Sequence, residues 1–446
     1  MSTYNRRDFV KLSTAAAVGA AVLTGITLPK EASSHNLAAE KTIRLGFVGI
    51  GGRGSYHLSS ALGMEGVEVP AICEINNERL SKAKKWIEES GRATPRLYGR
   101  GLTDFKRLCE EEDLDAVICS TPWEFHTPVC LSAMRHGKHA VSEVPIVVTL
   151  DEAWELVETY EKTGKWATIG LEGFGHLGVL NMIQKGLLGD IVHAQTGYIH
   201  DLRYVKFSPD EEPWRLKHSI NRNGNLYPDH PMNKMLPALG INHGDRIESL
   251  VSMSSFGGML NDYAAVYYKN KNHPLTKTKI ALGNYNASLI RTVNGKMMTL
   301  IHDTSTPHPR ENYRVQGTKG VFVGDSTASK IYIEGLSPVE HQWEPADAYL
   351  KEYEHPMVKN YNPPPRRGGT IQGHGNGGTQ TPMPWHRLIT ALRENKMPDW
   401  DVYDSITSSA IAPITEASVA NRSRPVDFPD FTKGKWKTSP PMTFDI

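Results

Sequence analysis

The chain has 446 residues, of which 39% are hydrophobic and 22% are charged, and its formal net charge is +1. This length predicts two or three domains with a sizeable core, and the near-neutral charge argues against nucleic acid or an anionic membrane surface as a partner. The four cysteines form no CxxC pair, so we expect neither a disulfide framework nor a bound metal.

The N-terminus predicts export from the cytoplasm. Arg6 and Arg7 precede an apolar run of small residues from Leu12 to Leu28, which is typical of a twin-arginine signal peptide. A membrane anchor is the alternative, because the run is nearly long enough to span a bilayer. Its Ala, Gly and Thr content and the polar linker after it favour a signal and linker over residues 1–40. The mature protein is then periplasmic or extracellular, with no stable membrane insertion.

Residues 41–170 are predicted to form a Rossmann domain that binds NAD. A strand over 43–48 runs into "GIGGRG", whose Gly49, Gly51 and Gly54 form a GxGxxG before a helix near Ser55. A second strand ends at Glu74, 20 residues after Gly54, where a carboxylate accepts hydrogen bonds from the adenosine ribose and repels a 2′-phosphate. NAD is therefore favoured over NADP. The alternative is a tight turn in an unrelated α/β protein.

Two further strands end in segments that we expect to face the cofactor. "LDAVICSTP" and "KHAVSEVPI" are apolar runs of the kind that a parallel sheet buries on both faces. Ligands of such sheets bind outside the carboxyl ends of the strands. The residues expected there are Thr121, Pro122, Trp123, Glu124, Phe125, His126, Glu143 and Val144.

Residues 171–446 hold the candidate acid–base groups. Tyr227 and His230 lie three apart in "NGNLYPDH", a Gly/Pro-punctuated loop that suits ligand binding, and an unperturbed imidazole titrates near pH 6.5. We expect His230 to be the main base and Tyr227 its partner or a hydrogen-bond donor; the alternative is local hydrogen bonding. His176 is either a second acid–base group or a capping or exposed histidine. Arg215 either clamps the substrate or forms a structural ion pair.

The chain resembles the Gfo/Idh/MocA oxidoreductases and, within them, glycoside hydrolase family 109, the NAD-dependent α-N-acetylgalactosaminidases. The resemblance is carried by "GFVGIGGRG", "STPWEFHTPV", "SEVP", "WRLKHSINRNGNLYPDH" and "INHGDRIESLVSMSS", and it covers almost the whole mature chain. It implies an α/β fold in which a Rossmann domain precedes an α/β domain with a large, mostly antiparallel sheet. In the related sugar dehydrogenases a catalytic lysine stands where this chain has Val144.

The resemblance also implies site residues. Cofactor contacts would come from Arg53, Gly54, Glu74, Trp123, Glu124, Phe125, His126, Glu143 and Val144, and sugar contacts from Tyr198, Arg215, Tyr227 and His230. Three positions depart from the family pattern. Gly173 and His176 replace an asparagine and a tyrosine, and Asp229-His230-Pro231 replaces Thr-His-Gly. The family's substrate tyrosine has no clean match, and Tyr313 is the nearest candidate.

The implied reaction has no net redox change. Hydride passes from C3 of the sugar to NAD⁺, the ketone acidifies the C2 proton, a base removes it, and the glycosidic bond is eliminated. Water then adds and the hydride returns. Such a cycle suits an exported enzyme, since no NAD pool is replenished outside the cytoplasm. Two alternatives stay open: a net NAD-dependent sugar oxidoreductase, and a non-catalytic sugar-binding protein. A homo-oligomer is possible in each case.

Overall fold

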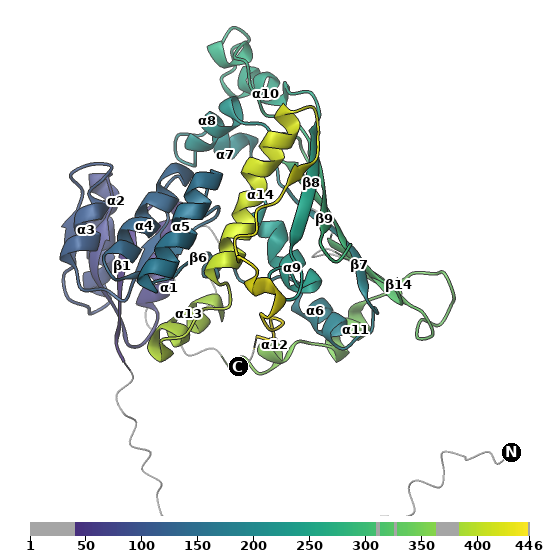
Figure 1. The fold of residues 1–446 in the computed structure, drawn as a ribbon. Helices are drawn as coiled ribbons and strands as arrows, with labels where there is room; N and C mark the ends of the chain where they lie inside the picture. Colours follow the sequence, from purple (N-terminus) through teal and green to yellow (C-terminus); the bar gives the residue numbers. More distant parts are fainter. Residues whose placement is uncertain (1–40, 309–312, 325–327, 363–382, 445–446) are drawn as a thin grey trace, which may run out of the picture. The chain divides into compact units, whose positions relative to one another are not determined.

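We obtained a computed structural model that describes residues 41–308, 313–324, 328–362 and 383–444 (Figure 1). The predicted signal and linker over residues 1–40 lie outside the described residues, so export stays a prediction. Residues 41–446 form one unit, which contains two sheets. No helix in the described ranges has the length and apolar character needed to cross a membrane.

The first sheet has six parallel strands in the order β3-β2-β1-β4-β5-β6. Its strands are β1 (Ile43–Val48), β2 (Val67–Cys73), β3 (Arg96–Tyr98), β4 (Ala116–Cys119), β5 (His139–Ser142) and β6 (Ala167–Thr168). Its helices are α1 (Gly52–Leu62), α2 (Asn77–Glu89), α3 (Phe105–Glu111), α4 (His126–Arg135) and α5 (Leu150–Thr163), with short 3₁₀ turns at Trp123–Phe125 (η1) and Gly170–Glu172 (η2). The strand order reverses between β1 and β4, where doubly wound sheets bind dinucleotides.

Local sequence accounts for these elements. Helices cover both faces of the sheet, which is why β4 is apolar throughout and buried at every position. Helix α5 begins with a capping box, in which the Glu152 N–H donates to Oγ1 of Thr149 at 3.2 Å, and it ends at Gly164 with φ +67°. Only a residue without a Cβ adopts that left-handed conformation readily.

The second sheet has nine strands in the order β14-β13-β12-β11-β7-β10-β9-β8-β15. They are β7 (Ile191–Ile199), β8 (Ile247–Ser254), β9 (Asn286–Thr292), β10 (Met297–Asp303), β11 (Tyr313–Gly317), β12 (Gly320–Gly324), β13 (Ser329–Ile333), β14 (Glu344–Pro345) and β15 (Val426–Asp427). The pair β7 and β10 is parallel and the other pairs are antiparallel. The predicted fold class, a Rossmann domain followed by an α/β domain with a large, mostly antiparallel sheet, is confirmed.

The second sheet is accompanied by helices of widely different length. They are α6 (Leu177–Gln184), α7 (Arg203–Phe207), α8 (Trp214–Asn221), α9 (Asp229–Leu239), α10 (Met259–Tyr267), α11 (Asp347–Glu352), α12 (Pro356–Lys359), α13 (Met383–Glu394) and α14 (Val402–Ala420), with 3₁₀ turns at Pro274–Thr276 (η3) and Lys435–Lys437 (η4). Helix α8 carries Arg215, and Tyr227 lies in the loop before α9. His230, predicted to lie in that loop, stands in the first turn of α9.

Helix α14 joins the two sheets and runs between α5 and β8 in Figure 1. Its buried face is rich in hydroxyl groups, and these satisfy backbone donors on both sides. Oγ of Ser409 accepts from the Ile146 N–H at 3.0 Å, just after β5, and Oγ of Ser418 accepts from the Ser252 N–H of β8 at 2.9 Å. Because buried backbone donors need partners, these bonds fix where the second domain meets the cofactor edge of the first.

Candidate active site

A cavity of about 540 Å³ lies at the carboxyl ends of β1, β2, β4 and β5. The first domain lines it with the glycine loop, the segment after β2 around Glu74, the loop after β4, and Glu143 and Val144. The second domain lines it with residues 209–215 and Tyr227. Both predicted domains therefore contribute to one cavity, in the place where the strand order predicts a ligand.

The glycine loop is shaped for close backbone packing. Gly49 has φ +83°, and a Cβ there would lie 2.6 Å from the carbonyl oxygen of Ser120. A Cβ on Gly54 would lie 2.0 Å from the carbonyl oxygen of Gly49, which no side chain tolerates. Around Gly52, in contrast, no protein atom lies within 4 Å of the added Cβ. The loop thus packs tightly on one side and leaves open space at the N-terminus of α1, the arrangement that accommodates a pyrophosphate.

Glu74 lies buried in the cavity wall, as the sequence predicts. Its carboxylate accepts the Ile50 N–H at 2.7 Å and the Asn76 N–H at 2.9 Å, one bond on each oxygen. A carboxylate oxygen has capacity for a second donor, so ribose hydroxyls can still be bound. The open helix N-terminus, the tight glycine packing and the acid at the end of β2 fit an NAD molecule in this cavity.

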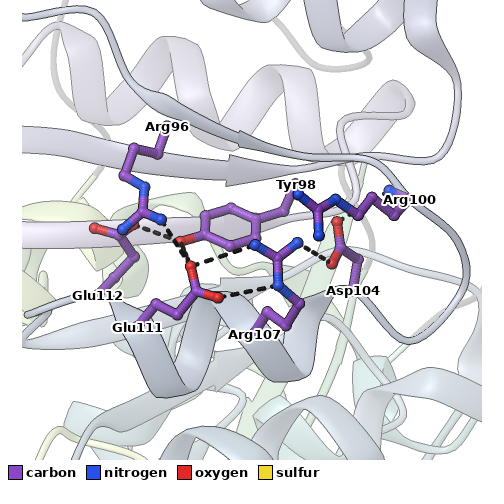
Figure 2. A network of polar contacts seen from close by, with 7 residues as sticks. All are labelled: Arg96, Tyr98, Arg100, Asp104, Arg107, Glu111 and Glu112. Carbon is purple, nitrogen blue, oxygen red and sulfur yellow. Dashed lines mark hydrogen bonds and ion pairs between the residues drawn. The ribbon is translucent and has the colours of Figure 1, made fainter.

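A polar network braces the loop between β3 and α3, next to the Glu74 end of the cavity (Figure 2). Asp104 accepts the Arg100 N–H at 2.9 Å and Nη1 of Arg107 at 3.0 Å. The buried Tyr98 hydroxyl donates to Glu112 at 2.5 Å. The network holds in place the loop that contains Gly101 and Leu102, and both residues line the cavity.

Glu143 is held at the centre of the cavity edge by two donors. Nε of Arg53 lies 3.1 Å from Oε1, and Nε2 of the buried His57 lies 2.5 Å from the same oxygen. The Trp385 indole N–H donates to Nδ1 of His57 at 3.2 Å, so the His57 proton resides on Nε2 and points at Glu143. Although burial opposes it, the Arg53 guanidinium and His57 hold the pKa of Glu143 far below its usual range.

Val144 is buried and lines the cavity beside Glu143. It carries no group that transfers a proton, so acid–base chemistry of the lysine type is absent at this position. His126 also lines the cavity, but its two ring nitrogens lie 2.7 Å from the carbonyl oxygens of Pro145 and Thr121. Burial lowers the pKa of His126, so the neutral ring donates a hydrogen bond to one of these two carbonyl oxygens, between the loop after β5 and the loop after β4.

The three residues of η1 do not all face the cavity. Trp123 and Phe125 line the cavity, and the Trp123 ring stacks on Tyr227 with centroids 5.3 Å apart. Glu124 is not among the described residues that line the cavity; its carboxylate lies 3.4 Å from Nε2 of His218. Glu124, predicted as a cofactor contact, thus lies against helix α8.

Arg215 and Tyr227 form the wall of the cavity that faces the second domain. Arg215 pairs with Glu212 and lies over the rings of Trp214, Tyr227 and Trp123 at 4.7, 5.0 and 5.1 Å. Burial raises the pKa of Tyr227 well above its ordinary value, although Arg215 opposes the shift. Tyr227 is therefore a protonated phenol at neutral pH, fixed by a guanidinium, which suits donation to a developing oxyanion.

His230 has an acidic partner that orients its ring. Nδ1 lies 2.5 Å from Oε1 of Glu172, which also accepts from Nδ2 of Asn233 at 3.1 Å. The His230 ring stacks on Tyr198 at 5.0 Å and meets Tyr227 edge-on at 4.7 Å. Nε2 makes no hydrogen bond to any described residue. A neutral imidazole that donates through Nδ1 presents Nε2 as an acceptor, which is the form a general base requires.

Tyr198 and His230 contact Tyr227 but do not line the large cavity, and the predicted site residues Gly173, His176 and Tyr313 do not line it either. Tyr313 is buried in β11 and packs against the ring of His176 at 5.0 Å, so neither lines the cavity. Gly173 has φ +70°, and its carbonyl oxygen accepts the Trp400 indole N–H at 3.0 Å. Gly173, which replaces the family's asparagine, thus forms a turn, and His176, which replaces the family's tyrosine, packs against Tyr313.

A second cavity of about 20 Å³ also has Trp123, Arg215 and Tyr227 in its wall. Lys206 lines it and donates through Nζ to Oγ1 of Thr304 at 2.8 Å. Burial, helped by repulsion from Arg215, lowers the pKa of Lys206 to about 7. The volume is that of about one water molecule. It is a buried polar space and too small for a sugar.

Three site features were not predicted from the sequence. They are the carboxylate of Glu172, the buried His57 and the buried Asp229. The acid at the end of the last strand of the first sheet was the available signal for Glu172. In the described part of the chain, no group of three or more His, Cys, Asp or Glu side chains has metal-binding geometry, and all four cysteines are free and buried.

Comparison with known families agrees with this architecture. Residues 43–171 match the oxidoreductase family with an NAD-binding Rossmann fold, and residues 175–438 match the C-terminal domain of glycosyl hydrolase 109. A glycosyl hydrolase family 109 protein of Solibacter usitatus is 37% identical over 99% of this chain and 100% of its own length. One from Shewanella pealeana is 36% identical over 98% of both chains.

Solved structures show the same fold at lower sequence identity. An oxidoreductase domain protein from Kribbella flavida has a TM-score of 0.65 and 18% identity, covering 87% of this chain and 100% of its own. Levoglucosan dehydrogenase in complex with NADH and levoglucosan has a TM-score of 0.62 and 18% identity, with 87% and 100% coverage. These structures share the fold of this chain. The family matches and the full-length relatives identify the family. The chain belongs to glycosyl hydrolase family 109.

Proposed function

We propose that this protein is an exported glycosidase that uses a tightly bound NAD in a redox-neutral cycle on α-N-acetylgalactosaminides or related glycosides. The observation that carries the proposal is that Arg215 and Tyr227 line a dinucleotide-shaped cavity, and that the His230–Glu172 pair adjoins it through Tyr227, whose ring lies 4.7 Å from that of His230. Family membership supports glycoside cleavage. The Arg6–Arg7 motif supports export.

The glycine loop, Glu74 and the segment beside Glu143 would hold the cofactor. When bound, NAD⁺ supplies reversible hydride acceptance at a sugar carbon, which acidifies the neighbouring C–H and makes elimination of the glycosidic bond possible. No pair of carboxylates flanking an oxocarbenium ion is needed for that chemistry. The protein has to supply a base, a donor to the developing enolate and a fixed geometry.

His230 is the proposed base. Glu172 fixes its ring through Nδ1 and stabilises the imidazolium that forms when Nε2 takes up a proton. Tyr227 is the proposed donor to the enolate oxygen, because its buried hydroxyl stays protonated and Arg215 stabilises negative charge beside it. Arg53 and His57 keep Glu143 ionised and in place at the cavity edge, where it orients polar groups.

The proposal is tested with purified protein, nitrophenyl α- and β-glycosides, and no added NAD. We expect nitrophenol release without accumulation of NADH, which is measured by chromatography because nitrophenol itself absorbs at 340 nm, and we expect NAD to be recovered from the denatured protein in about one equivalent per chain. Turnover that requires added NAD and accumulates NADH would identify a net sugar oxidoreductase. Binding of sugar without either reaction would identify a non-catalytic binding protein. Both outcomes contradict the proposal.

A further inference from the structure

Asp229, the first residue of α9, is a fully buried carboxyl group next to the proposed base. Its Oδ1 accepts the hydroxyl proton of Ser409 at 2.6 Å, while its Oδ2 is buried and has no hydrogen-bond partner among the described residues. A carboxylate with a single neutral donor in the protein interior is costly, whereas a neutral carboxyl is tolerated. Burial accordingly raises the pKa of Asp229 to about 7.

Hydrogen bonds through Ser409 connect Asp229 to the segment that follows β5. Oγ of Ser409, which donates to Asp229, accepts the Ile146 N–H at 3.0 Å. Ile146 follows Glu143 and Val144 of the cavity wall by three and two residues. The start of α9, with His230, is thereby tied through α14 to the segment that lines the cofactor cavity.

The charged and titratable groups that face Asp229 are few. On its own helix there is His230, and from η2 there is Glu172; helix α14 contributes the hydroxyls of Ser408 and Ser409. The cluster therefore holds two carboxyl groups and one imidazole. Glu172 already carries the negative charge that pairs with His230 at 2.5 Å. A second negative charge on Asp229 would stabilise the imidazolium further and make His230 a worse proton donor.

We propose that Asp229 is a positioning residue for His230 that remains protonated during turnover, so that Glu172 alone sets the basicity of the imidazole. The proposal rests on the role of His230 in the proposed function. In its neutral form Asp229 anchors the start of α9 to the cofactor segment without adding charge beside the base. Ionisation of Asp229 at higher pH adds that charge and raises the pKa of His230.

Asp229→Asn is the central variant, because it preserves shape and removes the titration. The pKa of His230 is measured by NMR of the holoprotein labelled at histidine ring carbons, with the signal assigned by His230→Asn. Because a neutral carboxyl and an amide carry the same charge, we expect Asp229→Asn to leave the pKa of His230 unchanged, as should the control Asp151→Asn at an exposed carboxyl on α5. Glu172→Gln, which removes the charge that the proposal makes responsible for the basicity, should lower the pKa of His230 by about 1 pH unit. A pKa of His230 lowered by Asp229→Asn would show that Asp229 is ionised beside the base, and would overturn the proposal.

Thermal unfolding provides a second readout that does not depend on activity. Since the pKa of Asp229 is raised by folding, the folded protein holds an extra proton between about pH 4 and 7, and this contribution to stability is lost as the pH rises. The Tm of Asp229→Asn relative to the natural chain should therefore rise from pH 4 to pH 7.5. A constant Tm difference would show that Asp229 does not titrate there, and would overturn the proposal. If no glycoside is cleaved at all, the proposed function fails while both measurements still report on Asp229.

Discussion

Glu172 and His230, 58 residues apart in the chain, meet with 2.5 Å between Oε1 and Nδ1. The carboxylate follows the last strand of the first sheet, and the imidazole stands in the first turn of α9. The proposed base is thus oriented by a carboxylate that directly follows the first sheet, while its ring stacks on Tyr198 of the second sheet.

Removing the base should abolish most turnover. We expect His230→Ala to lower kcat at least about 100-fold, and Glu172→Gln at least about 10-fold, because the amide cannot stabilise the imidazolium. The bound NAD content should stay unchanged in both. The measurement is steady-state kinetics with a nitrophenyl glycoside, and His341→Asn, at an exposed histidine, is the control. Near-normal rates for His230→Ala would remove it from the mechanism.

Gly54→Ala should disrupt the dinucleotide loop. The added methyl group would lie 2.0 Å from the Gly49 carbonyl oxygen, so the loop must move, at a cost of about 1–3 kcal/mol in the free energy of unfolding. We expect a lower Tm and loss of co-purified NAD. Gly52→Ala is the matched control for stability, since no protein atom lies within 4 Å of its Cβ. Equal Tm values for the two variants would contradict the packing described for Gly54.

Lys206 should make stability depend on pH above neutrality. Its pKa is lowered to about 7 in the folded protein, against about 10.4 when unfolded, so the unfolded chain binds more protons between these values. Stability of the natural chain therefore gains from this group as the pH rises from 7 to 10. Lys206→Met removes this pH dependence of stability. The Tm of Lys206→Met minus the Tm of the natural chain should therefore be larger at pH 6 than at pH 9.5.

Lys85→Met, at an exposed lysine, is the control for this comparison. It should show the same Tm difference from the natural chain at both pH values. An equal Tm difference at both pH values in Lys206→Met would contradict a lowered pKa for Lys206.

Export should depend on the paired arginines. Replacing Arg6 and Arg7 together by lysine is expected to leave the precursor in the cytoplasm, because the twin-arginine route reads that pair. Fractionation of a bacterial host with an intact twin-arginine route, followed by immunoblotting, measures the result. Equal amounts of the natural chain and the variant outside the cytoplasm would contradict this route.

The features predicted best from the sequence are those encoded by neighbouring residues. The glycine loop and Glu74 follow from strand, turn and helix signals within about 30 residues, and the cavity lies where those signals place it. The fold of the second domain was obtained only through family resemblance, because β7, β8 and β9 are separated by long connections that contain helices. The parallel pairing of β7 with β10, across about 100 residues, has no local signal.

The contacts that the sequence did not reveal are long-range ones. Glu172 and His230 are 58 residues apart, and Asp229 and Ser409 are 180 residues apart. His57 stands in an otherwise ordinary helix, and only its pairing with Glu143 makes it part of the site. The family resemblance gave Tyr313 as the nearest candidate for a substrate tyrosine, and His176 was left open between an acid–base and a capping or exposed role; the two rings pack on each other in the second domain.

Deuterium incorporation tests the central claim most directly. The protein, without added NAD, is incubated with a nitrophenyl glycoside in D₂O, and the released sugar is analysed by NMR and mass spectrometry. Removal of the C2 proton by His230 and its replacement from solvent predict deuterium at C2 of the product. Glycoside cleavage with hydrogen fully retained at C2 would contradict elimination and addition, and would show that this cavity cleaves the glycosidic bond by another route.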